Sequence, residues 1–225
     1  MCGIMGYIGD ENATDIIISG LEELEYRGYD SAGLAVCDGK EIKTVKVVGS
    51  PSGLREEADG IKGKIGIGHT RWATHGAPTV VNAHPHTSQS GLFTVVHNGI
   101  IENYSALKNE LIEKGFRFKS DTDTEVIAQM LEYLYNGDLK GTVGAALSRF
   151  KGSYALAIMC RDYPDCIVCA KLSSPLFAGI SSGCVYLASD VSAIATKSDR
   201  IFRVNDGEIG LLKKEGLKVF DLDGC

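Results

Sequence analysis

Several features that mark particular classes of protein are absent from this sequence. Acidic residues outnumber basic ones, 29 to 23, and the net charge is −6, whereas a nucleic-acid surface needs clustered lysine and arginine. No run approaches the roughly 20 apolar residues that cross a bilayer. The start of the chain also lacks the basic and long apolar segments of a secretory signal. We therefore expect a cytoplasmic protein that binds neither nucleic acid nor membrane.

Signs of a disulfide framework, a metal site and a nucleotide site are also missing. The seven cysteines are an odd number, and Cys37, Cys160 and Cys169 stand in apolar runs, as core-filling thiols do. His84 and His86 flank a proline, but no acid or thiol lies at a standard zinc-ligand spacing from them. No glycine-rich phosphate loop follows a strand. The sequence thus predicts neither a metal ion nor a cofactor.

The strand-like segments are short and numerous. Alternating or continuous apolar runs predict strands at residues 3–8, 34–37, 42–48, 65–69, 93–97, 154–159, 166–170, 185–188, 201–204 and 209–212. Asp38-Gly39 and Asp206-Gly207 have the residue types of tight hairpin turns. We therefore expect several neighbouring strands to pair directly and antiparallel.

Helical periodicity occupies the segments between these strands. Apolar spacing predicts helices that begin near Asn12 and lie around residues 107–112, 126–134 and 139–150, with a short one after Asp190. Gly115 is the expected stop of the second helix, and Thr122 and Glu125 have the spacing of a capping box before the third. Two packed antiparallel sheets with helices outside would bury all these stripes. We predict an α+β fold, a four-layer αββα sandwich of two antiparallel sheets, with residues 1–225 as one domain.

Cys2 follows the initiator methionine directly, and this position can give it two reactive groups. Removal of Met1 would leave Cys2 with a free α-amine, whose pKa of about 7.7–8.0 keeps a useful fraction neutral near neutral pH. Such an amine can take the thiol proton and later return a proton to a leaving group. The alternative is a cysteine that merely begins a strand and packs there. The position of Cys2 alone favours this alternative, but the other motifs together favour a catalytic thiol.

A polar loop follows the strand predicted at residues 65–69. It reads Thr70-Arg71-Trp72-Ala73-Thr74-His75-Gly76, and loops at strand ends commonly carry ligand contacts. Arg71 can pair with a carboxylate through two hydrogen bonds, Thr74 and His75 add hydrogen-bonding groups, and Trp72 could shield a site from water. The alternative is a surface ion pair at Arg71 beside a packed tryptophan.

Two further motifs have both a structural and a chemical interpretation. His97-Asn98-Gly99 is typical of a type I′ hairpin turn, but the Gly99 N–H and the Asn98 amide could instead form an oxyanion hole. The acids of residues 121–125 are typical of a helix N-terminus, although a ligand with an ammonium group would need one such carboxylate.

These motifs, in their order along the chain, resemble one family. The segments that carry the resemblance are Cys2-Gly3-Ile4, Glu25-Tyr26-Arg27-Gly28-Tyr29-Asp30-Ser31-Ala32-Gly33, residues 70–76, residues 97–103 and residues 121–125. They resemble the glutaminase halves of the glutamine–fructose-6-phosphate aminotransferase (glucosamine-6-phosphate synthase) family. That family belongs to the N-terminal-nucleophile, or class II, glutamine amidotransferases, whose fold is an αββα sandwich.

The resemblance implies a role for each matching residue. Cys2 would be the nucleophile and its own amine the base, and Asn98 and Gly99 would form the oxyanion hole. Arg71, assisted by Thr74 and His75, would hold the α-carboxylate of L-glutamine, and Asp123 its α-ammonium. Trp72 would gate the route of ammonia, with Arg27 and His84 in supporting positions.

The same resemblance implies a missing acceptor half. Members of the family continue into a sugar-isomerase half that receives the ammonia on fructose 6-phosphate, and we expect the full-length enzyme to be a homo-oligomer. This chain should then be the glutaminase part, hydrolysing glutamine through a γ-glutamyl thioester. Three alternatives stay open: a class II amidotransferase with another acceptor, an N-terminal-nucleophile amidase acting on some other amide, and a ligand-sensing domain without activity.

Overall fold

The computed structural model describes residues 2–72 and 76–222, which form two antiparallel sheets. The first sheet has seven strands, in the spatial order β11 (Arg200–Arg203), β9 (Phe177–Ser181), β10 (Cys184–Ala188), β1 (Gly3–Ile8), β4 (Ile65–Arg71), β2 (Ser31–Cys37) and β3 (Ile42–Val48). The second has six, in the order β13 (Gly216–Asp221), β12 (Glu208–Lys213), β8 (Tyr163–Leu172), β7 (Gly152–Cys160), β6 (Phe93–Ile101) and β5 (His86–Thr87).

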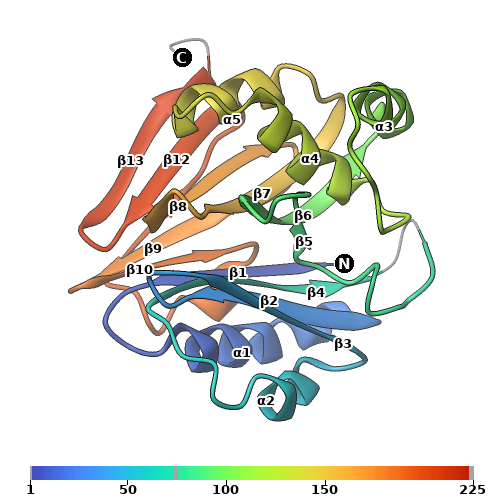
Figure 1. Ribbon diagram of the computed structural model, residues 1–225. Coiled ribbons are helices and arrows are strands. Elements are labelled where there is room, and N and C mark those ends of the chain that lie inside the picture. Colours follow the sequence, from blue (N-terminus) through green and yellow to red (C-terminus); the bar gives the residue numbers. More distant parts are fainter. Residues whose placement is uncertain (1, 73–75, 223–225) are drawn as a thin grey trace.

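Helices cover the outer face of each sheet (Figure 1). α1 (Ala13–Glu23) and α2 (Leu54–Glu57) lie against the first sheet, and α3 (Tyr104–Glu113), α4 (Thr124–Leu134) and α5 (Leu139–Leu147) lie against the second. Short 3₁₀ turns connect the remaining segments at Glu25–Arg27, Pro51–Gly53 and Val191–Ala193. Over the residues described, no helix is long and apolar enough to cross a membrane.

Successive side chains along a strand point to opposite faces of the sheet, so alternate residues belong to different buried layers. In β1, Ile4 and Ile8 join the apolar cluster between the two sheets, whereas Met5 and Tyr7 join the cluster beneath α1. β4 follows the same rule, with Ile67 between the sheets and Gly68 beneath α1, where a Cβ atom would come within 2.3 Å of Ile17. Alternation therefore produces three buried layers, and the predicted αββα sandwich is confirmed.

Two local predictions were wrong, and one of the two interpretations of Asn98-Gly99 is excluded. Asp206-Gly207 does not close a hairpin, because β11 pairs in the first sheet and β12 in the second. Asn98-Gly99 is not a turn, since β6 continues through both residues. Thr122 and Glu125 do not form a capping box: Asp123 is the N-cap of α4, and the Glu125 carboxylate accepts from the backbone of residues 119 and 120 instead.

Candidate active site

One cavity of about 450 Å³ opens where β1 begins, β4 ends and β6 passes the start of α4. The residues that the sequence singled out and that line this cavity are Cys2, Arg27, Arg71, Trp72, His84, Asn98, Gly99 and Asp123. Thr74 and His75 lie outside the described residues. Segments far apart in the sequence thus bring their polar side chains to one place.

The Cys2 thiol is fixed by the backbone of its neighbouring strand end. The pairing of Gly3 with Thr70 sets the end of β4 beside Cys2. Sγ accepts a hydrogen bond from the Trp72 N–H at 3.2 Å and lies 3.5 Å from the Trp72 carbonyl oxygen, to which the S–H can donate. Burial raises the pKa of the Cys2 thiol, although the Trp72 N–H acts in the opposite direction. The thiol therefore needs a base to become a nucleophile at neutral pH.

Trp72 and Arg27 form one side of the cavity. Gly28 has a φ of +86°, and a Cβ atom there would lie 2.6 Å from the Trp72 ring, so glycine is required on both grounds. Arg27 pairs with Asp190, with Nη1 at 2.9 Å from Oδ2. The Arg-Gly pair of the family signature therefore has a physical reason: the arginine is anchored and the glycine lets the indole pack.

A buried cation and a buried anion line the same cavity. The Arg71 side chain is 5% exposed, donates to the carbonyl oxygens of Gly76 at 3.0 Å and Ala77 at 3.3 Å, and lies 3.8 Å from Asp30. The Asp123 carboxylate accepts from the Ile101 N–H at 2.8 Å. A zwitterionic ligand would meet one fixed charge of each sign, which a neutral amide would not exploit.

Asn98 and Gly99 adjoin Cys2 from the opposite sheet. The Asn98 Nδ2 donates to the Cys2 carbonyl oxygen at 3.2 Å. Gly99 has a φ of +130°, and a Cβ atom would come within 2.1 Å of the Ser153 carbonyl oxygen, so only glycine fits without a shift of β7. Asn98 and Gly99 thus bring an amide side chain and a backbone N–H, on consecutive residues, to the cavity that Cys2 also lines.

Four histidines are buried near the cavity. Of these, His84 and His97 line it, and only His84 was predicted as a site residue. His69 lies 2.9 Å from Asn98, His97 and His84 both contact the Thr124 hydroxyl, and His86 contacts Thr122. Burial is the main cause that lowers the pKa of all four, to about 3 for His69. The rings are therefore neutral at neutral pH.

The sequence held one signal for His69. Residues 65, 67, 69 and 71 alternate along β4, so His69 continues the face that begins with Ile65 and ends with Arg71. His97 has the same signal, because residues 93, 95 and 97 alternate along β6. The two-residue strand β5 is too short to give such a signal for His86. Over residues 2–72 and 76–222, no three histidine, cysteine or acidic residues are placed to hold a metal ion.

Solved structures share this arrangement of sheets and helices. The chain superposes on a glutamine phosphoribosylpyrophosphate (PRPP) amidotransferase from B. subtilis, complexed with ADP and GMP, with a TM-score of 0.87 and 30% sequence identity. The match covers 98% of this chain and 49% of that one. A glutamine aminotransferase class-II domain protein from Silicibacter pomeroyi has a TM-score of 0.67 at 16% identity, which bears on the fold alone. The fold is that of the N-terminal-nucleophile amidotransferases.

Sequence comparison defines the family. The model of the glutamine amidotransferase domain matches residues 53–214, and the chain belongs to this family. It is 52% identical to a glutamine–fructose-6-phosphate aminotransferase (isomerizing) of Caldanaerobacter subterraneus and 48% identical to one of Thermus thermophilus. Both matches cover 100% of this chain, which spans 37% of the length of either relative.

Proposed function

We propose that residues 1–225 form one glutaminase domain, which hydrolyses the side-chain amide of L-glutamine to glutamate and ammonia. One observation carries the proposal: a single cavity is lined by the Cys2 thiol, the Asn98 carboxamide, and a buried cation and anion, Arg71 and Asp123. Free glutamine presents a γ-amide together with an α-carboxylate and an α-ammonium. The cavity therefore offers a complementary group for each part of this substrate.

The recognition groups act on the two charges of the amino acid. Arg71 holds the α-carboxylate, with Thr74 and His75 assisting, and Asp123 holds the α-ammonium. Arg27 and His84 line the cavity and support its walls. Trp72 separates the reacting amide from solvent and gates the departure of ammonia.

The covalent steps use the two functional groups of one residue. After Met1 is removed, the Cys2 amine takes the Sγ proton as Sγ adds to the amide carbon, and Asn98 and Gly99 stabilise the oxyanion. The C–N bond then breaks, and the amine donates its proton to the nitrogen that leaves as ammonia. Water adds to the γ-glutamyl thioester with the amine again as base. The C–S bond breaks, giving glutamate and the free thiol.

The names of the relatives indicate which domain receives the ammonia in a longer protein. In full-length relatives we propose that a sugar-isomerase half takes the ammonia and converts fructose 6-phosphate to glucosamine 6-phosphate, the entry to hexosamine synthesis. The 52% identity to an aminotransferase of that name favours this acceptor over phosphoribosylpyrophosphate, whose amidotransferase is 30% identical.

The direct test combines turnover with labelling. The purified chain should release glutamate and ammonia from glutamine, and much less from N-acetylglutamine or glutamine amide, each of which lacks one charge. 6-Diazo-5-oxo-norleucine should add to Cys2, and intact mass should show the loss of Met1 in the same spectrum. Cys2→Ala should abolish both turnover and adduct. Full activity in Cys2→Ala, or equal use of the blocked substrates, would overturn the proposal.

A further inference from the structure

The Asn98 carboxamide is held at both ends by groups of the first sheet. Its Oδ1 lies 2.9 Å from the His69 Nε2, and its Nδ2 lies 3.2 Å from the Cys2 carbonyl oxygen. His69 is fully buried and Asn98 is 8% exposed. Both contacts cross from β6 to the facing sheet, so they connect the two layers of the sandwich at the cavity.

These contacts allow only one orientation of the carboxamide. The Cys2 carbonyl oxygen accepts hydrogen bonds but cannot donate them, so the nitrogen of the carboxamide must face it. A reversed carboxamide would place two acceptor oxygens 3.2 Å apart in a buried setting, with no proton between them. Consequently Oδ1 faces His69 and needs a donor there.

The same requirement fixes the tautomer of His69. Because burial lowers the pKa of His69 to about 3, the ring carries a single proton at neutral pH. A proton on Nδ1 would leave the Nε2 lone pair against Oδ1, and Nδ1 has no hydrogen-bond partner among the described residues. With the proton on Nε2, the ring donates to Oδ1 and no N–H is buried without an acceptor.

The ring of His69 is in turn held in place by His84. The two rings stack with centroids 4.0 Å apart and an interplanar angle of 13°. His84 Nδ1 accepts from the His97 backbone N–H at 3.3 Å, so its proton must be on Nε2, which donates to the Thr124 hydroxyl at 3.3 Å. The hydroxyl then donates to His97 Nδ1 at 3.0 Å. His97 Nε2 faces the Ser153 carbonyl oxygen at 3.5 Å, which places the His97 proton on Nε2 and leaves Nδ1 to accept from Thr124. The hydrogen bonds from His84 to His97 therefore all run in one direction.

We propose that His69 is a positioning residue for the glutaminase reaction: its Nε2–H holds the Asn98 carboxamide with both N–H groups turned toward Cys2 and the cavity. This inference rests on the proposed function. One N–H of Nδ2 binds the Cys2 carbonyl oxygen, and the other is kept for the oxyanion that forms next to Sγ. Without the Nε2 donor, the carboxamide can reverse and present an oxygen to that negative charge.

Two variants separate the hydrogen bond from the bulk of the ring. His69→Leu fills a similar volume and removes the donor, whereas His69→Gln retains an amide N–H near the position of Nε2. We expect His69→Leu to lower kcat about 10- to 100-fold with KM changed less than about 2-fold, because the oxyanion contact exists only in the transition state. His69→Gln should restore most of the loss.

A double-mutant cycle tests whether His69 affects kcat through the Asn98 carboxamide. In an Asn98→Ala background, His69→Leu should lower kcat no further, since the carboxamide it acts on is gone. His86→Leu is the matched control: it removes another buried neutral histidine, whose partner is Thr122 rather than Asn98. We expect it to lower stability comparably and to leave kcat within about 2-fold.

The tautomer can be measured without any variant. In the wild-type chain, ¹⁵N shifts of His69 should show a protonated Nε2 and a bare Nδ1, unchanged between about pH 6 and 8. A proton on Nδ1, or an equal kcat loss with and without Asn98, would overturn the positioning role. Wild-type protein that fails to hydrolyse glutamine would instead overturn the proposed function and would leave the tautomer result standing.

Discussion

The Cys2 thiol lies in surroundings that oppose its ionisation. Burial raises the pKa of this thiol above its ordinary value of 9.0. A reaction that relied on a preformed thiolate would therefore gain rate only at strongly alkaline pH. A reaction in which the α-amine takes the proton depends instead on the amine being neutral.

The pH dependence of kcat/KM distinguishes these two routes. We expect kcat/KM to rise as the pH passes through about 7.7–8.0, the range of an α-amine, and then to level off. The measurement is kcat/KM for glutamine over that range, with a preparation that retains Met1 as the control, in which the rise should be missing. A rise that begins only above pH 9 would point to the thiolate route.

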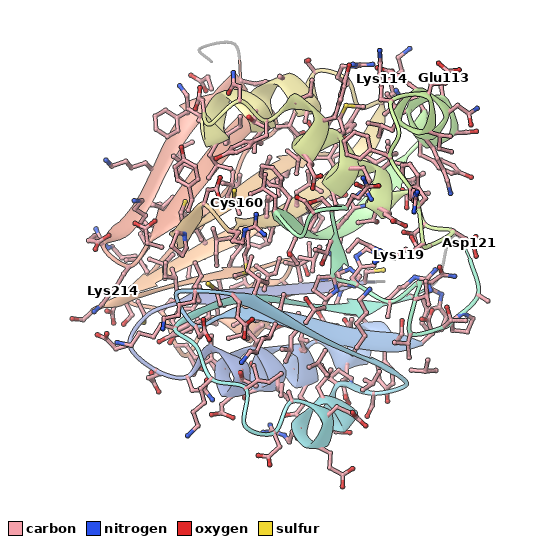
Figure 2. All side chains as sticks on the ribbon, in the orientation of Figure 1. Glu113, Lys114, Lys119, Asp121, Cys160 and Lys214 are labelled. Atoms are coloured by element: carbon pink, nitrogen blue, oxygen red, sulfur yellow. The ribbon has the colours of Figure 1, made fainter. Side chains whose placement is uncertain are left out.

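A substitution at Asp123 tests how the α-ammonium of glutamine is recognised. Asp123→Asn removes the charge and keeps an oxygen that can accept from the Ile101 N–H. Loss of a hydrogen bond to a charged group, about 1.5–3 kcal/mol, should raise KM for glutamine roughly 10- to 100-fold with a smaller change in kcat. Asp121→Asn is the matched control, because Asp121 is exposed at the edge of the molecule (Figure 2). Equal KM changes in both variants would exclude a specific role for Asp123.

At the scale of elements, the strands and helices with a clear apolar periodicity were predicted from the sequence. The predicted segments 3–8 and 42–48 coincide with β1 and β3, and the helix expected near Asn12 is α1. β9 and β13 were not predicted, because their strand character depends on pairing with β10 and β12 rather than on a clear apolar pattern. The Asp206-Gly207 signal was misleading because turn residues do not specify which sheet the next strand joins.

The site was predicted unevenly for a related reason. Residues with family motifs were found, and eight of them line one cavity. His69, which contacts Asn98, and His97, which lines the cavity, were not recognised as site residues, because a buried neutral histidine has no sequence signature apart from its strand face. The interpretation of Asn98-Gly99 as a turn followed a local preference that the long pairing of β6 with β7 overrides.

A substitution at Gly99 measures how much the close contact between β6 and β7 contributes to stability. Gly99→Ala places a methyl group against the Ser153 carbonyl oxygen and keeps a φ of +130°, and we expect it to lower the free energy of unfolding by about 2–4 kcal/mol. Gly39→Ala is the control, since Gly39 also has a positive φ but a Cβ atom there would contact nothing within 4 Å. Urea unfolding of both variants gives the comparison. Similar losses would mean that the contact with β7 adds nothing.

At the scale of the whole molecule, the buried histidines connect stability to pH. Burial lowers the pKa of His69, His84, His86 and His97, so below about pH 6.5 the unfolded chain binds protons that the folded chain does not. Stability is therefore retained above that pH and lost as the pH falls. Each histidine contributes a slope of about 1.4 kcal/mol per pH unit.

We expect the free energy of unfolding to fall steeply between about pH 6.5 and 5 and to change little between about 6.5 and 8. Urea unfolding at several pH values measures the slope, which the linkage relation converts to the number of protons taken up. His86→Leu should lower that number by about one. A free energy that stays constant or rises toward acid pH would show that these rings are protonated in the folded protein.

Trp72 gives the molecule a built-in optical reporter. It is the only tryptophan in the chain, its side chain is 54% exposed at the cavity, and its backbone holds the Cys2 thiol. Because there is no other tryptophan, all tryptophan fluorescence comes from the proposed site. Indole emission shifts with local polarity, and a ligand that enters the cavity should therefore change the spectrum. A titration of the inactive Cys2→Ala variant with glutamine would then give a dissociation constant directly, without turnover and without an attached dye.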